Sequence, residues 1–257
     1  PDGTDLDKNH RVTVTVTDHK KNPQENKNII VKGDLSQTAK GKTDQDGKLT
    51  IPEIEERERH GTYILGYTDG TFGPSRSMTR AEAAAIFARL LAEKNGDTIS
   101  TVANTRFTDI PAHAWYSGYA KYLNNNGVTY GKSKTIFAPN DAITRAEFTT
   151  LAVRFFDVYG DGDAEIMEQF SGFNDVSSGY WAAEYIKYAA LHGWINGYGD
   201  GSFHADREIN RAEVVTIVNR LLGREADEDY IADNLRKLNT FPDVSRKHWA
   251  YYAVMEA

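Results

Sequence analysis

The sequence contains no cysteine among its 257 residues. This absence excludes disulfide bonds, thiolate metal sites and cysteine nucleophiles, but it fits an oxidising compartment as well as a reducing one. No apolar run approaches the roughly 18 residues that a membrane-spanning helix needs, so we expect no insertion into a membrane. An exported protein is therefore compatible with this composition.

Basic residues are in deficit, with 30 lysines and arginines against 37 aspartates and glutamates and a formal net charge of −7. A protein that binds nucleic acid through a broad surface needs an excess of positive charge on that surface. We therefore expect no nucleic-acid partner, although a local cationic pocket can exist on an acidic protein.

Catalytic signatures are missing as well. The sequence has no G-x-S-x-G, H-E-x-x-H or P-loop motif, and its seven histidines lack the spacing of metal ligands. Asp161, Asp163 and Glu165 imitate the start of a calcium loop without its later ligands, which favours a solvated acidic linker. Nothing singles out the two carboxylates of a glycosidase. We therefore predict a protein that is not an enzyme and holds no cofactor or metal.

What the sequence does have is one unit in three copies, spread over residues 61–257. Each copy combines a helix start of the form T/N-R-A-E, an F-x-D-V/I motif and a tryptophan. The arginines, aspartates and tryptophans are Arg80, Arg145 and Arg211, then Asp109, Asp175 and Asp243, then Trp115, Trp181 and Trp249. Equivalent residues in successive copies are 65 to 68 positions apart, and a fixed period of this kind indicates a repeat architecture.

Each copy is predicted to form a helix, a turn and a second helix around the tryptophan. The helix start predicts a capping box, in which Thr or Asn caps the N-terminus and Glu reaches back from three residues later. GYTDGTF at residues 66–72 predicts a tight turn with its Phe directed inward, and GYGDGSF repeats it at residues 197–203. In the middle copy Lys134 and Thr135 replace the Asp-Gly pair, so we expect a different turn there.

The first part of the chain has a different sequence pattern from the repeats. Within residues 1–56, apolar and polar residues alternate in the segment RVTVTVTD, and short runs of β-forming residues follow it. This pattern predicts a small all-β, sandwich-like module. Residues 57–65 are expected to form a charged linker. Residues 66–257 then hold the three repeats, with two uninterrupted copies at 107–157 and 173–223.

The repeated unit resembles the S-layer homology (SLH) family, through F-x-D-V, W-A, G-Y-x-D-G-T-F and T-R-A-E in one order over nearly all of residues 61–257. The resemblance implies a pseudo-threefold anchor that binds bacterial cell-wall polysaccharide, commonly at a pyruvylated sugar, in a secreted protein of the cell wall or S-layer. Residues 1–56 resemble bacterial Ig-like or carboxypeptidase-regulatory-like modules, mainly through Thr43, Asp44 and Gly47.

The two halves of the first repeat unit stand at opposite ends of the repeat region. The segment before Gly66 has no F-x-D-V motif and no tryptophan, whereas residues 241–257 supply that half. We expect residues 241–257 to complete the half-repeat 66–93, so that the C-terminal helix closes the ring and buries apolar faces at both ends. The predicted fold is therefore mainly α, a pseudo-threefold SLH module closed by its C-terminal helix, with a small all-β module before it.

Three arginines carry the predicted contact with glycan. A helix N-terminus with unpaired amides favours an anion, and an arginine at the first helical position adds a planar fork suited to a carboxylate. The pyruvyl ketal implied by the resemblance carries such a carboxylate, so we predict that Arg80, Arg145 and Arg211 bind it. In the alternative interpretation each arginine pairs with a nearby acid and braces the repeat.

Aromatic and acidic side chains complete the predicted glycan site. The tryptophan of each copy offers a flat apolar platform for a sugar ring, with core packing as the alternative. The aspartate of each F-x-D motif accepts from sugar hydroxyls or caps the following helix, and capping is the preferred interpretation. These residues are Trp115, Trp181, Trp249, Asp109, Asp175 and Asp243.

The predicted function is that of a non-catalytic cell-surface anchor that binds pyruvylated cell-wall polysaccharide in grooves between the repeats. The alternative is a module that binds other S-layer subunits, or self-associates in the surface lattice, without holding glycan. A wall-acting glycoside hydrolase is a third class, and it would require specific catalytic carboxylates.

Overall fold

The computed structural model describes residues 62–159 and 170–257, together with short stretches among the first 51 residues. The chain forms two compact units, Pro1–Gly61 and Thr62–Ala257. The predicted acidic linker around Asp163 lies outside the described residues.

The first unit contains short strands in two antiparallel sheets, in the orders β1-β2-β5 and β3-β4. The strands are β1 (Asp5–Leu6), β2 (Val12–Thr15), β3 (Asn28–Lys32), β4 (Thr38–Lys42) and β5 (Lys48–Ile51). These segments do not show a sandwich, so the all-β module at residues 1–56 and its Ig-like likeness stay predictions. Most of the predicted linker at residues 57–65 lies outside the described part of the chain.

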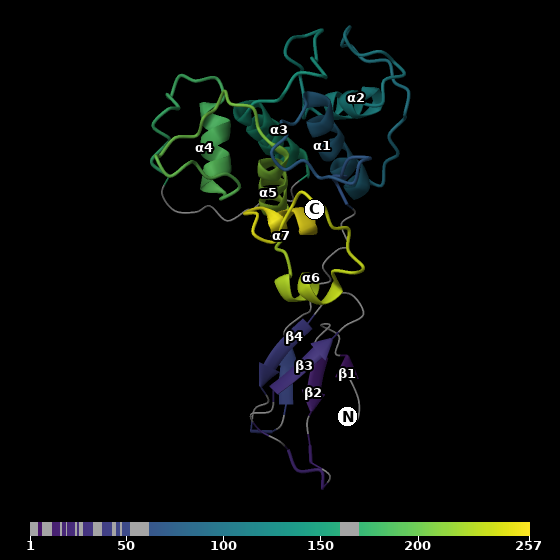
Figure 1. Ribbon diagram of the computed structural model, residues 1–257, viewed down its shortest axis with the longest axis vertical. Helices are drawn as coiled ribbons and strands as arrows, with labels where there is room; N and C mark the ends of the chain where they lie inside the picture. Colours follow the sequence, from purple (N-terminus) through teal and green to yellow (C-terminus); the bar gives the residue numbers. More distant parts are fainter. Residues whose placement is uncertain are drawn as a thin grey trace. The chain divides into compact units, whose positions relative to one another are not determined.

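The second unit is helical, as predicted for the repeats (Figure 1). Its helices are α1 (Arg80–Asn95), α2 (Ser117–Asn125), α3 (Arg145–Tyr159), α4 (Ala183–Leu191), α5 (Arg211–Leu221), α6 (Glu228–Asn234) and α7 (Tyr251–Glu256). The repeat pattern does not predict α6, which lies between the third capped helix and the last F-x-D-V motif. Among the described residues, no helix has the length and apolar character needed to cross a membrane.

The helices α1, α3 and α5 begin in the predicted capping boxes. Thr79 Oγ1 accepts from the amide of Glu82 at 3.2 Å, and the Glu82 carboxylate accepts from the amide of Thr79 at 2.8 Å. The same reciprocal bonds join Thr144 with Glu147 and Asn210 with Glu213. Each cap fixes the helix start and contributes about 1 kcal/mol of stability.

The three copies meet in a closed cycle of backbone hydrogen bonds just before these helix starts. The amide of Met78 donates to the carbonyl of Ile209 at 2.9 Å, Ile209 to Ile143 at 3.0 Å, and Ile143 back to Met78 at 2.9 Å. All three side chains are fully buried. Every copy thus donates to one neighbour and accepts from the other, which gives the second unit its pseudo-threefold arrangement.

The turn phenylalanines point inward, as predicted. Each packs against the phenylalanine of an F-x-D motif, with ring centroids 5.1 to 5.4 Å apart. The pairs are Phe72 with Phe241, Phe137 with Phe107, and Phe203 with Phe173. Gly66 must lack a side chain here, because a Cβ atom would lie 2.4 Å from the Phe241 ring.

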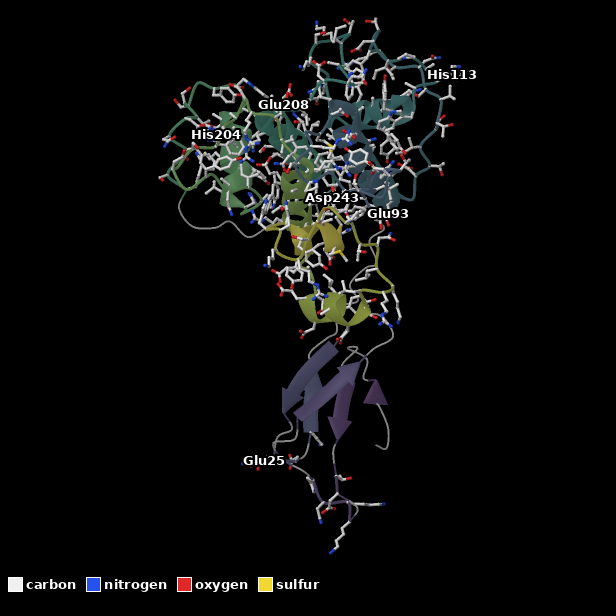
Figure 2. All side chains as sticks on the ribbon, viewed as in Figure 1. Glu25, Glu93, His113, His204, Glu208 and Asp243 are labelled. Atoms are coloured by element: carbon white, nitrogen blue, oxygen red, sulfur yellow. The ribbon has the colours of Figure 1, made fainter. Side chains whose placement is uncertain are left out.

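The last residues of the chain contact the first turn of the repeat unit. Asp243, labelled in Figure 2, accepts from the amides of Phe72 at 2.8 Å and Gly73 at 2.7 Å. The amide of Tyr63 donates to the carbonyl of Ala257 at 3.2 Å, and α7 packs against α5. We expect contacts of this kind if residues 241–257 complete the half-repeat 66–93.

We predict that Asp243→Asn lowers the free energy of unfolding by about 1 to 3 kcal/mol, because a carboxylate that accepts from two amides is replaced by a group with one acceptor. Urea denaturation of the full chain measures the change. Asp233→Asn, at an exposed position on α6, is the matched control and should change stability by less than about 0.5 kcal/mol. Equal stability of the two variants would contradict the role given to Asp243.

Candidate functional site

The arginines at the helix starts lie beneath the surface. Only 6% of Arg80, 4% of Arg145 and 3% of Arg211 is exposed. Each Nε donates at 2.8 Å to the carbonyl of a turn phenylalanine in another copy. The accepting residues are, in the same order, Phe137, Phe203 and Phe72. Each guanidinium therefore joins the helix of one copy to the turn of the next.

Two of these arginines also pair with a glutamate at the start of the next helix. Arg80 lies 3.2 Å from Glu147, and Arg145 lies 3.0 Å from Glu213. Arg211 instead donates through Nη2 to the carbonyl of Leu65 at 2.6 Å. Burial lowers the pKa of all three guanidinium groups, and the glutamate opposes that shift in the paired ones. These contacts fit the bracing interpretation, while direct binding of glycan stays a prediction.

The amides at these helix starts are already occupied. Arg80 N donates to the carbonyl of Asp141 at 3.0 Å, and Ala81 N donates to that of Pro139 at 3.0 Å. The same bonds run from Arg145 to Arg207, from Ala146 to Ala205, from Arg211 to Arg76 and from Ala212 to Pro74. The expectation of unpaired amides that attract an anion is therefore wrong, because the adjacent turn satisfies them.

The F-x-D aspartates hold the turns rather than the helices. Asp109 accepts from the amides of Phe137 at 2.9 Å and Ala138 at 2.6 Å. Asp175 accepts likewise from Phe203 and His204, and Asp243 from Phe72 and Gly73. The N-cap residues of α2, α4 and α7 form no side-chain capping bond, so the preferred capping interpretation is wrong. A contact of these aspartates with sugar hydroxyls stays a prediction.

The three repeat tryptophans lie at the surface. Exposure is 56% for Trp115, 57% for Trp181 and 65% for Trp249, and each precedes its helix by two residues. Core packing, the alternative considered for them, is therefore wrong. Their indole rings are accessible to a ligand, and a large apolar face left in water is an unfavourable arrangement that binding a partner relieves.

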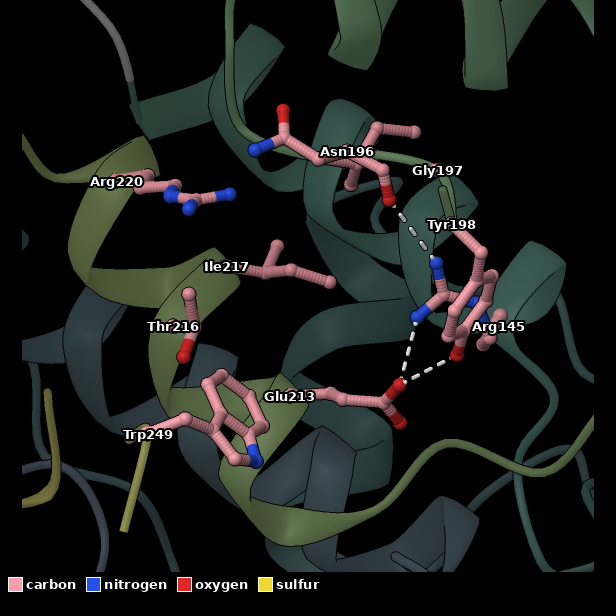
Figure 3. Close-up of a pocket in the computed structure, with 10 residues that line it drawn as sticks. Arg145, Asn196, Gly197, Tyr198, Glu213, Thr216, Ile217, Arg220 and Trp249 are labelled. Carbon is pink, nitrogen blue, oxygen red and sulfur yellow. Dashed lines mark hydrogen bonds and ion pairs between the residues drawn. The ribbon is translucent and has the colours of Figure 1, made fainter. Parts of the chain in front are cut away.

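One groove brings together two of the predicted glycan residues, Arg145 and Trp249 (Figure 3). It has a volume of about 230 Å³ and lies between the start of α3, one face of α5 and residues 195–198. Glu213 accepts from Arg145 Nη1 at 3.0 Å and from the hydroxyl of Tyr198 at 2.9 Å. The carboxylate charge in the groove is thus engaged by protein donors.

The groove also contains Arg220, which is not among the predicted glycan-binding residues. A cation in the last turn of a helix is already favoured by the helix dipole, so its presence at the end of α5 called for no further explanation. No motif marks it as a binding residue. In the described part of the chain, no cluster of histidine, aspartate and glutamate is suited to a metal ion.

The rim of each groove, meaning the surface residues next to the buried arginine, differs between the copies. In two copies an arginine lies over a tyrosine ring: Arg76 over Tyr67 at 4.0 Å, and Arg207 over Tyr198 at 5.6 Å. In the middle copy the equivalent positions hold Lys132 and Asp141, which form an ion pair at 2.9 Å. The rim of the middle copy therefore differs in charge through Lys132 and Asp141, whereas the predicted change of turn rests on Lys134 and Thr135.

Comparison with known protein families matches the S-layer homology domain to residues 43–84, 106–149 and 172–215. The second and third matches include the F-x-D motifs and the starts of α3 and α5. The first match begins at residue 43, earlier than the start at residue 61 expected from the motifs.

Known relatives that match this chain include proteins named for bacterial surfaces and several enzymes. "Cell surface glycoprotein 1" of Acetivibrio thermocellus is 35% identical over 77% of this chain and 8% of its own length. The "Cellulosome-anchoring protein" of that organism is 31% identical over 84% of this chain and 46% of its own length. The "Surface-layer 125 kDa protein" of Lysinibacillus sphaericus is 32% identical over 62% of this chain and 13% of its own length.

These matches indicate a secreted protein of the bacterial cell surface, as predicted. The chain spans less than half the length of each of the three relatives.

We predict that acid weakens the fold through two of the F-x-D aspartates, Asp175 and Asp243. Partial burial opposes ionisation, but the backbone donors outweigh it and hold the pKa of Asp175 and Asp243 below the usual range. Their stabilisation is complete above the unfolded-state pKa of about 3.9 and is lost as the pH falls through the lower folded-state pKa. Urea unfolding measured from about pH 5 down to about pH 2 should show this loss.

The variant Asp175→Asn/Asp243→Asn should lose less stability than the unsubstituted chain over the same pH range, because two of the groups responsible no longer titrate. Asp233→Asn serves again as the control and should follow the unsubstituted chain. If the double variant shows the same acid dependence as that control, the bonds to the turn amides are not its source.

Proposed function

The chain belongs to the S-layer homology domain family, and from this membership we propose that it is a non-catalytic anchor that binds acidic cell-wall polysaccharide, with a pyruvylated sugar as the unit held. The observation that carries the proposal is the groove in which the exposed ring of Trp249 lies with the guanidinium of Arg145. An apolar platform beside a cation suits a sugar that bears a carboxylate.

The tryptophans supply the first half of this recognition. One face of a pyranose ring is lined with C–H groups, and it stacks on an aromatic ring that is free to receive it. The rings of Trp115, Trp181 and Trp249 are all more than half exposed. We therefore assign one sugar-binding platform to each copy.

The arginines supply the second half. Arg145 has five N–H donors, and three of them are engaged by Phe203, Glu213 and Asn196, which leaves two for a ligand at the groove. Arg80 and Arg211 occupy the equivalent positions in the other copies. In this proposal all three brace the fold, and each offers its remaining donors to the ligand.

The aspartates act indirectly in the same proposal. Asp109, Asp175 and Asp243 hold the turns against which the arginines are fixed, so they position the groove without needing to contact the sugar. On this basis we also propose that residues 66–257 form one triple module, in which residues 241–257 complete the half-repeat 66–93. The preceding β-rich part remains a proposed separate module, with an Ig-like or carboxypeptidase-regulatory-like arrangement.

A second candidate function is an interaction between surface proteins, in which the repeats bind S-layer subunits without glycan. The exposed tryptophans favour it as well, because exposed aromatic residues also anchor protein interfaces. The two functions differ in the ligand, so binding to protein-free polysaccharide separates them.

We predict that Trp115→Ala/Trp181→Ala/Trp249→Ala weakens binding of the full chain to purified cell-wall polysaccharide by tenfold or more, because each ring loses apolar contact worth roughly 25 cal/mol per Å². A sedimentation assay with the insoluble wall fraction and calorimetry with soluble polysaccharide measure the change. Since the rings are exposed, the variant should keep its folded-state spectrum. Tyr230→Ala, which removes an exposed aromatic residue on α6, is the matched control and should bind normally.

The same assay tests the acidic sugar. Removing pyruvate from the polysaccharide by mild acid should abolish most binding, while a mock-treated sample retains it. Unchanged binding after removal would reject the pyruvylated unit but leave a neutral glycan ligand. Binding to S-layer protein in the absence of any polysaccharide affinity would reject the anchor function in favour of the second candidate.

A further inference from the structure

Each of α1, α3 and α5 carries a second arginine nine residues after the buried one. These arginines are Arg89, Arg154 and Arg220. Two of them are engaged by a tyrosine four residues after the repeat tryptophan. Arg89 lies 5.1 Å from the centroid of the Tyr119 ring, and Arg154 lies 5.0 Å from that of Tyr185.

Arg154 is held most firmly. Its Nε and Nη2 lie 3.3 and 3.1 Å from the Tyr185 hydroxyl, and its guanidinium also lies 4.9 Å from the Tyr130 ring. Both Arg89 and Arg154 are half-buried. Contacts of this kind hold a guanidinium against an aromatic ring, and in Arg154 they also occupy donors on two of its nitrogens.

Arg220 has no such partner, because the position four residues after Trp249 is Ala253. Arg220 is exposed, and no carboxylate within the described residues forms an ion pair with it. Its polar neighbour is Asn196, whose amide oxygen can accept from Nη1 at 3.3 Å when its nitrogen donates to the carbonyl of Ile195. Figure 3 shows the Arg220 guanidinium in the groove without a dashed line to any residue drawn.

The surroundings of Arg220 suit a sugar more than a free anion. Thr216, Ile217 and Trp249 line the same groove, so a hydroxyl, an aliphatic surface and an indole ring share it with the Arg220 guanidinium. Arg220 is exposed as a residue, but the groove walls partly desolvate its guanidinium, which lowers the pKa of Arg220 with no offset from an acidic neighbour. Its charge is thus partly desolvated and uncompensated, which strengthens its attraction for an anionic ligand.

The acidic residue in this groove does not cancel that charge. Glu213 accepts from Arg145, Arg207 and the Tyr198 hydroxyl, so its negative charge is shared among other donors. A ligand carboxylate near Arg220 would therefore meet a cation that has no internal carboxylate to compete for it.

We propose that Arg220 binds the carboxylate of an acidic sugar whose ring lies on Trp249, and that alanine at residue 253 leaves it free to do so. This inference rests on the proposed function and deepens it. It makes the groove between α3 and α5 the one that binds the acidic sugar most tightly, because the equivalent arginines of the other two grooves are held by Tyr119 and Tyr185.

The test uses the full chain, with calorimetric titration of two small probes. One is the pyruvyl ketal of a methyl hexoside, and the other is its isopropylidene counterpart, in which a methyl group replaces the carboxylate. The unsubstituted chain should prefer the acidic ketal. Arg220→Gln should weaken its binding by about ten- to a hundredfold, the loss expected for one charge-assisted bond.

Two further variants isolate the cause. Arg154→Gln makes the same change at the equivalent position and should retain binding of the acidic ketal within about twofold, well inside the effect of one hydrogen bond. Ala253→Tyr places the missing tyrosine beside Arg220, and it should reduce binding to the level of Arg220→Gln. Melting curves report whether each variant is folded.

Nuclear magnetic resonance locates the bound sugar independently of affinity. The indole N–H signal of Trp249 should shift on addition of the acidic ketal, at lower concentrations than those of Trp115 and Trp181. Arg220→Gln should remove that difference among the three signals.

Equal affinity of Arg220→Gln and the unsubstituted chain would overturn the inference, and so would equal binding of the two ketals or binding of neither. The proposed anchor function is judged separately by the polysaccharide assay. Polysaccharide affinity that depends on pyruvate and survives Arg220→Gln would leave that function standing and place the carboxylate in another groove.

Discussion

The repeat unit depends on the closed cycle of backbone hydrogen bonds among Met78, Ile143 and Ile209. Because each residue donates to one neighbour and accepts from the other, no copy can leave without orphaning a buried donor and a buried acceptor. The cycle also brings three helix N-termini toward one centre, together with the arginine that follows each cap. Like charges and like dipole ends would repel there, so the remaining contacts of the helix starts must offset them.

The four-residue helix start supplies that compensation. Thr or Asn and Glu form the capping box, and the Glu of two copies also pairs with the arginine of the preceding one. The turn of the next copy contributes carbonyls to the arginine side chain and to the first two helix amides. One short motif thus stabilises both its own helix and the contact between copies. The proposed ligand grooves lie outside these contacts, nearer the surface.

Much of this was accessible from the sequence because it is local or repeated. Capping boxes depend on residues three apart, and the inward phenylalanines follow a turn motif, so both were predicted correctly. The carbonyl acceptors of the arginines could not be identified from local patterns, because Phe137, Phe203 and Phe72 lie 57, 58 and 139 residues away. The helix-capping role preferred for the aspartates was wrong for the same reason, because the turn amides they accept from lie far along the chain. Arg220 could not be predicted as a binding residue, because its lack of a tyrosine partner depends on Ala253. Residue 253 lies on α7, and the packing of α7 against α5 is what brings it near Arg220.

Positions at the centre and at the rim are under different constraints. Arg80, Arg145 and Arg211 are identical because each bridges two copies, and replacing one would leave a turn carbonyl without its donor. At the rim a side chain serves only its own groove, so Lys132 can stand where the other copies have tyrosine, and alanine can stand at residue 253. Three copies of one scaffold can therefore offer three different surfaces. Since the copies are covalently joined, even a weak contact in a second groove would increase attachment to a polymer that presents many sugars, because the second binding event is intramolecular.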